Sequence, residues 1–189
     1  MTRQAAEKGL NFLKMDAAEL AKFHVVLQTS QGDIECEMWP DVAPNHVRNF
    51  LDLVDTGFYN GILFHRVSPD FMIQGGDPNT RDKPNDRGTW GMGNGPRRVP
   101  AEFNDKKHVP GVLSAARSQD PNSASSQFFI MTKANPQLDG SYSGFGKVLE
   151  GMDAVMKIAK APGEASPRDG TVKPAEPQRI ERTYVILPD

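Results

Sequence analysis

An arginine and an amide inside one short apolar segment are the side chains of this chain best suited to do chemistry. Residues 64–77 read FHRVSPDFMIQGGD, which places Arg66 and Gln74 among phenylalanine, valine, methionine and isoleucine. A guanidinium stays charged at neutral pH and presents several N–H donors in a rigid fork, and an amide both donates and accepts hydrogen bonds. The segment therefore predicts a small apolar pocket with one cationic hydrogen-bond donor.

A second segment carries aromatic and amide side chains that a strand would place on one face. Residues 125–130 read SSQFFI, and strand alternation sends Gln127 and Phe129 to the same side. The two segments, in this order, resemble the two signatures of the cyclophilins, the cyclosporin-binding peptidyl-prolyl isomerases. The resemblance runs from about residue 23 to the carboxyl end. It is strongest to the bacterial cytoplasmic members, judged from EFND at 102–105 and GVLSAAR at 111–117.

This resemblance implies isomerisation of X-Pro peptide bonds in polypeptides, in support of protein folding. Rotation about such a bond crosses a barrier of ~18–20 kcal/mol without breaking a covalent bond. The catalyst therefore needs no nucleophile, metal or cofactor, but it must bind the twisted amide more tightly than the planar one. Because the twisted nitrogen becomes a hydrogen-bond acceptor, Arg66 is the predicted donor. Gln74 either holds the neighbouring carbonyl or orients the guanidinium.

The resemblance also implies which residues form the site. Arg66 and Gln74 would be the catalytic pair, and the main chain of Arg117 would pair with the substrate backbone. Tyr142, where many members have histidine, would contact the substrate as well. The residues expected to line the proline site are Arg66, Phe71, Met72, Gln74, Ala116, Gln127, Phe129 and Leu138.

Departures from the family pattern bear on specificity. Gln137 occupies the place of an aromatic residue, tryptophan in cyclosporin-sensitive members, at the expected rim of the pocket. We therefore expect weak or no cyclosporin binding. Ser68 replaces an apolar residue, and the loop after Asp77 is charged, which predicts a different selection of residues beyond proline.

Two other functions stay open. A proline-peptide binding module that recruits partners and catalyses weakly would account for Gln137 and for the altered loop. A barrel that binds a small ligand is a third interpretation. Neither of these needs both Arg66 and Gln74, so the presence of that pair favours the enzyme.

Short strands separated by turns, with two helical stretches, must position these side chains. Polar and apolar residues alternate at 34–38, which indicates a strand with one solvated face. At 43–56 apolar residues recur at helical spacing, and Gly57 is placed to end that helix. This spacing of strands indicates a barrel or a sandwich. The resemblance to the cyclophilins implies a mainly β fold, a closed antiparallel eight-stranded barrel of cyclophilin type capped by two α-helices. The expected strands are 23–28, 34–38, 63–67, 72–74, 112–115, 127–132, 145–148 and 180–187, and the expected helices are 43–56 and 152–159.

Residues 1–21 precede the part that resembles the family and form an expected N-terminal arm, with residues 22–189 as the isomerase domain. Asp16 and Glu19 have the spacing of a capping box, which predicts a short helix in the arm. Because every predicted site residue lies beyond the arm, we expect its removal to change turnover little. The irregular stretch 78–100 is long for a compact domain, which predicts a functional or mobile loop.

Composition restricts partners and location. With a net charge of -2 and a pI of about 6.1, the chain has no broad cationic field for nucleic acid or an anionic membrane. The single cysteine, Cys36, excludes an intramolecular disulfide, and no apolar run predicts a signal peptide or a membrane span. We expect a cytoplasmic monomer whose partners are proline-containing peptides and unfolded proteins.

Other reactive residue types have simpler interpretations. Cys36 alternates with apolar residues and is expected to be a small core side chain. His65 lies beside Arg66 on the opposite strand face and is expected to be structural. The histidines lack paired ligand spacing, so no metal site is predicted, and the glycine run 91–95 lacks the lysine of a phosphate loop.

Overall fold

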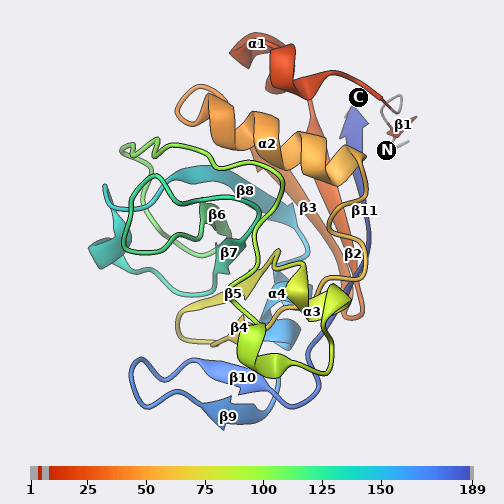
Figure 1. Ribbon diagram of the computed structural model, residues 1–189. Coiled ribbons are helices and arrows are strands. Elements are labelled where there is room, and N and C mark those ends of the chain that lie inside the picture. Colours follow the sequence, from red (N-terminus) through yellow and green to blue (C-terminus); the bar gives the residue numbers. More distant parts are fainter. Residues whose placement is uncertain (1–3, 6–8, 188–189) are drawn as a thin grey trace.

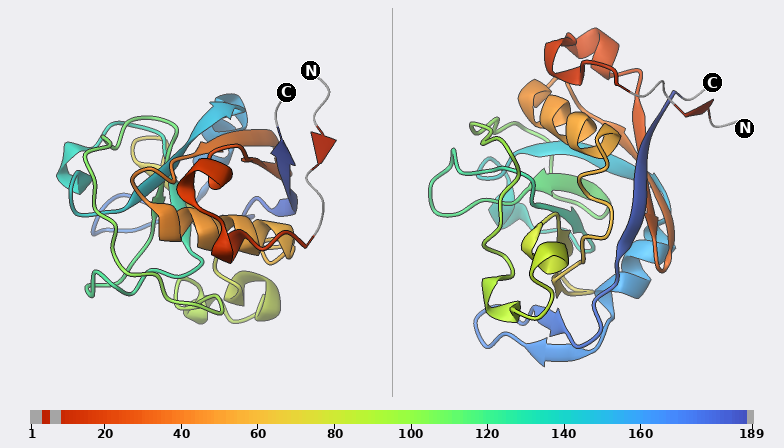
Figure 2. Two further views of the ribbon diagram at one scale, coloured as in Figure 1. Left: turned by 90° about the horizontal axis from the view of Figure 1, so that it is seen from above. Right: turned by 45° about the vertical axis from the view of Figure 1, so that its right-hand side comes forward.

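The computed structural model describes residues 4–5 and 9–187, which form an antiparallel sheet curled around one apolar core (Figure 1). Helix α2 (Pro44–Asp55) crosses one end of the sheet, and helix α4 (Met152–Ala159) lies nearer the other end. The first and last described strands lie side by side, because β1 (Gln4–Ala5) pairs with β11 (Ile180–Leu187) (Figure 2).

A strand is present in each of the eight predicted regions, although the one predicted at 63–67 covers only Arg66–Val67, and three short strands were not predicted. The order of the eleven strands in the sheet is β1-β11-β2-β3-β8-β6-β7-β5-β4-β10-β9. The unpredicted strands β1, β9 and β10 have only two or three residues each, too few to show alternation. Besides β1 and β11, the strands are β2 (His24–Thr29), β3 (Gly32–Met38), β4 (Arg66–Val67), β5 (Met72–Gly75), β6 (Val112–Ala115), β7 (Phe128–Met131), β8 (Gly144–Glu150), β9 (Gly163–Ala165) and β10 (Val172–Pro174).

The predicted closed barrel of eight strands is not confirmed. Within the described residues, β1 and β9 end the sheet and do not pair with each other. Short strands have been added at both sides: β1 pairs with β11, and the β9–β10 hairpin pairs with β4. The additions are small, since β1 pairs with two residues of β11 and β10 pairs with one residue of β4.

The two predicted longer helices are α2 and α4, and α4 has the predicted bounds. Helix α2 has proline at its first position, where the missing N–H costs nothing, and Gly57 follows its C-cap with a φ of 72°. Among the described residues, no helix is long and apolar enough to cross a membrane. The remaining helices are single turns: α1 (Ala17–Leu20), α3 (Asn79–Asp82), and the 3-10 helices η1 (Phe12–Lys14), η2 (Arg87–Thr89) and η3 (Pro136–Leu138).

An aromatic cluster joins α2 to the strands that carry the site. The ring of Phe50 lies 5.3 Å from that of Phe128 and 5.2 Å from that of Phe145, measured between centroids. Phe128 is the first residue of β7, and its neighbour Phe129 belongs to a second apolar cluster on the other face of the strand. Core packing therefore fixes the strand that presents Phe129.

The described part of the arm packs into the main core. The capping box is confirmed: Glu19 N–H donates to Oδ1 of Asp16 at 2.8 Å, and Asp16 N–H donates to Oε2 of Glu19 at 3.1 Å. Phe12 is fully buried, and its ring lies edge-on to Phe23 at 5.2 Å. The domain division at residue 22 stays a prediction. Because removal of the arm would uncover part of the core, we now expect truncation to lower stability.

Candidate active site

Strands β5, β6 and β7 form a small pocket on the face that is turned away from the main core. Its apolar floor is a cluster built on Met72 and Phe129, which are only 1% and 5% exposed. The cavity has a volume of about 160 Å³. It brings together every predicted site residue except Gln127. Its lining residues are Arg66, Phe71, Met72, Gln74, Ala116, Arg117, Phe129, Leu138 and Tyr142.

The pairing of β4 with β5 sets the polar edge of this pocket. Arg66 and Gln74 are cross-strand partners, and such partners project from the same face of a sheet. Nη1 of Arg66 donates to Oε1 of Gln74 at 2.9 Å, and the guanidinium carbon lies 5.7 Å from the centre of the Phe71 ring. The predicted catalytic pair is therefore in direct contact at the mouth of an apolar cavity.

Gln127 holds this pair from behind. Its Nε2 donates to the carbonyl oxygens of Gly91 and Gly93, at 3.0 and 2.8 Å, and these oxygens can only accept. Oε1 of Gln127 is thereby left to accept from Nε2 of Gln74, at 3.0 Å, and Oε1 of Gln74 must face Arg66. Two main-chain carbonyls thus determine the orientation of both amides and present a fixed acceptor to the guanidinium.

The glycine run 91–95, for which the sequence predicted no site, contacts Gln127 and borders a second cavity. Besides accepting from Gln127, it lines a neighbouring cavity of about 260 Å³, which also includes Gln127 itself. The buried carboxylate of Asp77 holds this loop by accepting a hydrogen bond from the main-chain N–H of Gly91. A Cβ on Gly93 would lie 2.0 Å from Oδ1 of Asp77, so no larger residue fits there. The sequence signal was the glycine spacing itself.

Arg117 lies at the rim of the pocket. Its side chain is hydrogen-bonded, whereas among the described residues its main chain is not. The guanidinium donates to the Ser141 carbonyl at 3.1 and 2.8 Å and lies 4.5 Å from the centre of the Tyr142 ring. Its main-chain N–H and carbonyl make no hydrogen bond to other described residues. This backbone is therefore available to pair with an extended peptide.

Comparison with known proteins identifies the chain. The family described as cyclophilin type peptidyl-prolyl cis-trans isomerase/CLD matches residues 24–185. The chain belongs to this family. Probable peptidyl-prolyl cis-trans isomerase of Brucella suis biovar 1 (strain 1330) is 47% identical over 165 residues, which cover 85% of this chain and 81% of that protein. The corresponding isomerase of Acinetobacter baylyi is 41% identical over 158 residues, covering 81% and 80%.

Solved structures agree with this assignment. A cyclophilin type peptidyl-prolyl cis-trans isomerase of Cryptosporidium parvum, crystallised in the presence of the dipeptide Ala-Pro, is similar with a TM-score of 0.72 and 30% identity. The similarity covers 88% of this chain and 99% of that one. The present cyclophilin thus has the mainly β cyclophilin fold, and its activity is peptidyl-prolyl cis-trans isomerisation.

A buried serine and histidine, with a partly exposed aspartate, lie behind the pocket and were not predicted. Nε2 of His108 lies 2.9 Å from Oγ of Ser114, and its Nδ1 lies 3.1 Å from Oδ1 of Asp139. The same order occurs in hydrolases, but Ser114 is fully buried here, so no substrate carbonyl can reach it. The imidazole stacks on Phe129 with ring centroids 6.2 Å apart, and burial lowers the pKa of His108. In this cyclophilin the three residues therefore support the pocket wall.

Other residues singled out in the sequence have the following places. Cys36 is fully buried in the main core, as predicted, and burial raises the pKa of its thiol. His65 is buried beside Arg66, and burial lowers its pKa to about 4, so the ring is neutral at physiological pH. Gln137 lies on η3 next to Leu138, but its side chain is exposed and does not line the pocket.

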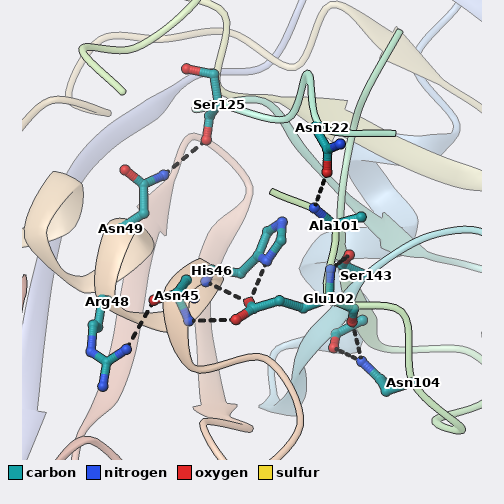
Figure 3. A network of polar contacts seen from close by, with 11 residues as sticks. Asn45, His46, Arg48, Asn49, Ala101, Glu102, Asn104, Asn122, Ser125 and Ser143 are labelled. Carbon is teal, nitrogen blue, oxygen red and sulfur yellow. Dashed lines mark hydrogen bonds and ion pairs between the residues drawn. The ribbon is translucent and has the colours of Figure 1, made fainter. Parts of the chain in front are cut away.

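A polar network joins the start of α2 to the segment before β8 (Figure 3). The Glu102 carboxylate accepts from the main-chain N–H groups of Asn45 and His46, at 2.9 and 3.0 Å, and caps the helix. Burial acts to raise the pKa of Glu102, but the hydrogen bonds from His46 and Asn45 outweigh it and lower the pKa. The Glu102 N–H donates to Oγ of Ser143 at 2.9 Å, which fixes the segment next to Tyr142.

Proposed function

We propose that Arg66 accelerates isomerisation by donating a hydrogen bond to the amide nitrogen of the X-Pro bond as that bond twists. The planar amide nitrogen is conjugated and accepts no hydrogen bond, so the contact forms mainly in the transition state. It therefore lowers the barrier without strengthening the binding of the planar substrate. Gln74 keeps the guanidinium oriented, and Gln127 keeps Gln74 oriented.

The strongest support is the position of the Arg66 guanidinium. Its side chain is 35% exposed and held by hydrogen bonds at the mouth of the apolar cavity, where a proline ring can lie against Phe71, Met72 and Phe129. A charged donor beside an apolar pocket suits a substrate whose ring is apolar and whose neighbouring nitrogen becomes an acceptor.

We propose that the bound peptide passes over the pocket, next to Arg117 and the cavity beside Gln127. The Cryptosporidium parvum cyclophilin was crystallised in the presence of Ala-Pro, which supports a proline-containing peptide as the ligand of this pocket too. The open main chain of Arg117 would pair with the peptide backbone. The cavity beside Gln127 would receive a side chain that precedes or follows proline at a short distance.

A protease-coupled assay on a proline tetrapeptide tests the role of Arg66. A charged hydrogen bond contributes about 1.5–3 kcal/mol, so Arg66→Ala should lower kcat/KM by about ten- to a hundred-fold. Arg182→Ala, an exposed arginine on β11, serves as the matched control and should turn over like the unmodified protein. Equal turnover by the two folded variants would show that Arg66 is not the donor.

Weak cyclosporin binding is also proposed. The exposed amide of Gln137 offers little apolar surface at a position where sensitive cyclophilins have tryptophan. Gln137→Trp should tighten cyclosporin binding by at least about tenfold, as expected for a new aromatic contact in a hot spot. Isothermal titration of both forms measures the gain, and tetrapeptide turnover should change only modestly. Equal affinities would place position 137 outside the cyclosporin site.

The cellular setting is proposed from composition. The net charge of -2 offers no broad cationic field for nucleic acid or an anionic membrane. We propose a cytoplasmic monomer that acts on unfolded proteins. Gel filtration and cell fractionation test these two expectations separately.

A further inference from the structure

Arg66 has partners on a segment that lies outside both signature segments. Its Nε donates to Oγ1 of Thr171 at 3.1 Å, and its Nη2 lies 2.6 Å from Oδ2 of Asp169. With the bond from Nη1 to Gln74, every nitrogen of the guanidinium has a partner. A guanidinium carries a pair of N–H groups on each terminal nitrogen, so one N–H on each stays available for a substrate.

Asp169 and Thr171 also hold each other. Oδ1 of Asp169 accepts from the main-chain N–H of Thr171 at 3.0 Å and from its hydroxyl at 2.6 Å. Because the hydroxyl proton is directed to Asp169, a lone pair of Oγ1 is left to accept from Nε of Arg66. Burial acts to raise the pKa of Asp169, but the hydrogen bonds from Thr171 and Arg66 outweigh it and hold the pKa well below its usual range. The carboxylate is therefore ionised at neutral pH.

The turn that carries these residues is held by main-chain contacts. It connects β9 to β10, and Val172 of β10 pairs with Val67, the neighbour of Arg66. The Ser166 N–H donates to the Thr171 carbonyl at 2.7 Å. Arg87 donates to two further carbonyls at the end of β10, at 3.2 and 2.7 Å. These contacts do not use the side chains of Asp169 and Thr171, so the pairing of β10 with β4 and β9 should persist when those side chains are changed.

The guanidinium has room to move if these contacts are lost. Arg66 lines both the proline pocket and a larger cavity of about 740 Å³ beneath the β9–β10 hairpin. Gln74 holds it from one strand only, through Nη1. Asp169 and Thr171 accept its remaining hydrogen bonds, from a segment more than a hundred positions further along the chain.

We propose that Asp169 and Thr171 are positioning residues, which keep the Arg66 guanidinium in the orientation that meets the twisted amide nitrogen. The inference rests on the proposed role of Arg66 as the donor. Because the planar substrate does not use this donor, a misplaced guanidinium lowers kcat and leaves KM nearly unchanged.

The test compares four variants on one proline tetrapeptide, with kcat and KM measured separately. Asp169→Ala should lower kcat by about five- to twenty-fold with KM within about twofold, as expected for loss of a charged contact to the catalytic donor. Thr171→Val, which removes only the hydroxyl, should lower kcat by about two- to fivefold. Thr171→Ser restores the hydroxyl and should restore kcat. Arg168→Ala changes an exposed neighbour in the same turn and should match the unmodified protein.

Heteronuclear NMR provides a second readout that a purely structural role would not move. The Nε–H of Arg66, assigned by its absence in Arg66→Ala, should exchange faster with water in Thr171→Val than in Thr171→Ser. Unchanged exchange and unchanged kcat in Thr171→Val would overturn the role of Thr171.

Arg66→Ala, measured alongside, separates the two levels of the proposal. If Arg66→Ala loses activity while Asp169→Ala keeps the full kcat, the positioning role of Asp169 is wrong and the catalytic role of Arg66 stands. If Arg66→Ala keeps full turnover, the catalytic role of Arg66 and the positioning role of Asp169 and Thr171 are both wrong. A higher kcat in Asp169→Ala would also overturn the inference, because the carboxylate would then be competing with the substrate for the guanidinium.

Discussion

The proline pocket has a polar edge and an apolar wall, which are held by different forces. The polar edge consists of partly exposed side chains joined by directed hydrogen bonds, from Arg66 through Gln74 to Gln127. The apolar wall, built on Met72 and Phe129, is almost completely buried. Hydrogen bonds at a solvent-exposed surface contribute little net stability, but they determine the orientation of the side chains that they join. Buried apolar area contributes mainly to stability. We therefore expect changes in the edge to alter rate and changes in the wall to alter folding.

The two parts also differ in what stands behind them. The edge is backed by main-chain carbonyls of the glycine loop and by the turn before β10. The wall is backed by His108, whose two ring nitrogens both have polar partners. A buried polar group whose partners are complete stabilises a single packing arrangement, and it becomes costly when one partner is removed.

Replacement of Phe129 should have the largest effect. If it changed only the rate and not the stability, the expectation that the apolar wall acts on folding would be wrong. Phe129→Ala leaves a cavity beneath the pocket and should lower the free energy of unfolding by about 3–5 kcal/mol. It should also raise KM. Phe12→Ala, which changes a buried residue of the arm, is the matched control. It should lose a similar amount of stability, while its kcat and KM stay within about twofold of those of the unmodified protein. Urea denaturation and tetrapeptide kinetics on both variants distinguish the effect of the pocket wall on substrate binding from a general loss of core packing.

A pH titration sharpens the comparison at His65, which is buried next to the polar edge. Its pKa is lowered by burial to about 4, below its ordinary value, so the unfolded chain binds the proton more readily than the folded one. The contribution of the neutral ring to stability is complete above pH ~6.5 and is lost as the pH falls towards the folded pKa. Protonation of His65 alone should therefore lower the free energy of unfolding by about 3 kcal/mol.

His65→Phe should lack this part of the pH dependence. Its free energy of unfolding, measured by urea denaturation, should fall less steeply than that of the unmodified protein between pH ~6.5 and ~4. Carboxylates titrate in both proteins, so only the difference between the two curves reports on His65. Parallel curves would mean that His65 is as easily protonated in the folded state as in the unfolded chain.

Gln127→Ala should have the smallest effect and tests whether the edge acts through orientation. Without Gln127 the amide of Gln74 is free to turn, and kcat should fall by about three- to tenfold. The free energy of unfolding should change by less than about 1 kcal/mol, because the side chain is partly exposed. Arg182→Ala again provides the control for the assay. A loss of several kcal/mol with normal kcat would assign Gln127 to the fold instead of the site.

Several elements could be predicted because their pattern is local. Helix α4 shows its apolar repeat within two turns, and the capping box of Asp16 and Glu19 spans a single turn. The strands β1, β9 and β10 could not be predicted, since each is too short to display a period. They exist only through pairing: β1 with β11, β9 with β10, and β10 with β4. The burial of Phe12 likewise depends on where the arm meets α2.

The sequence by itself determined the family and most of the pocket. Arg66 and Gln74 are eight positions apart on strands joined by one turn, so a local motif is enough to place them side by side. Only the tertiary structure showed that Asp169, 103 positions away, completes the contacts of the guanidinium, and that the arm belongs to the core. A hydrogen bond requires two atoms within about 3 Å, and between distant segments that distance follows from the packing of whole elements, which no local spacing encodes.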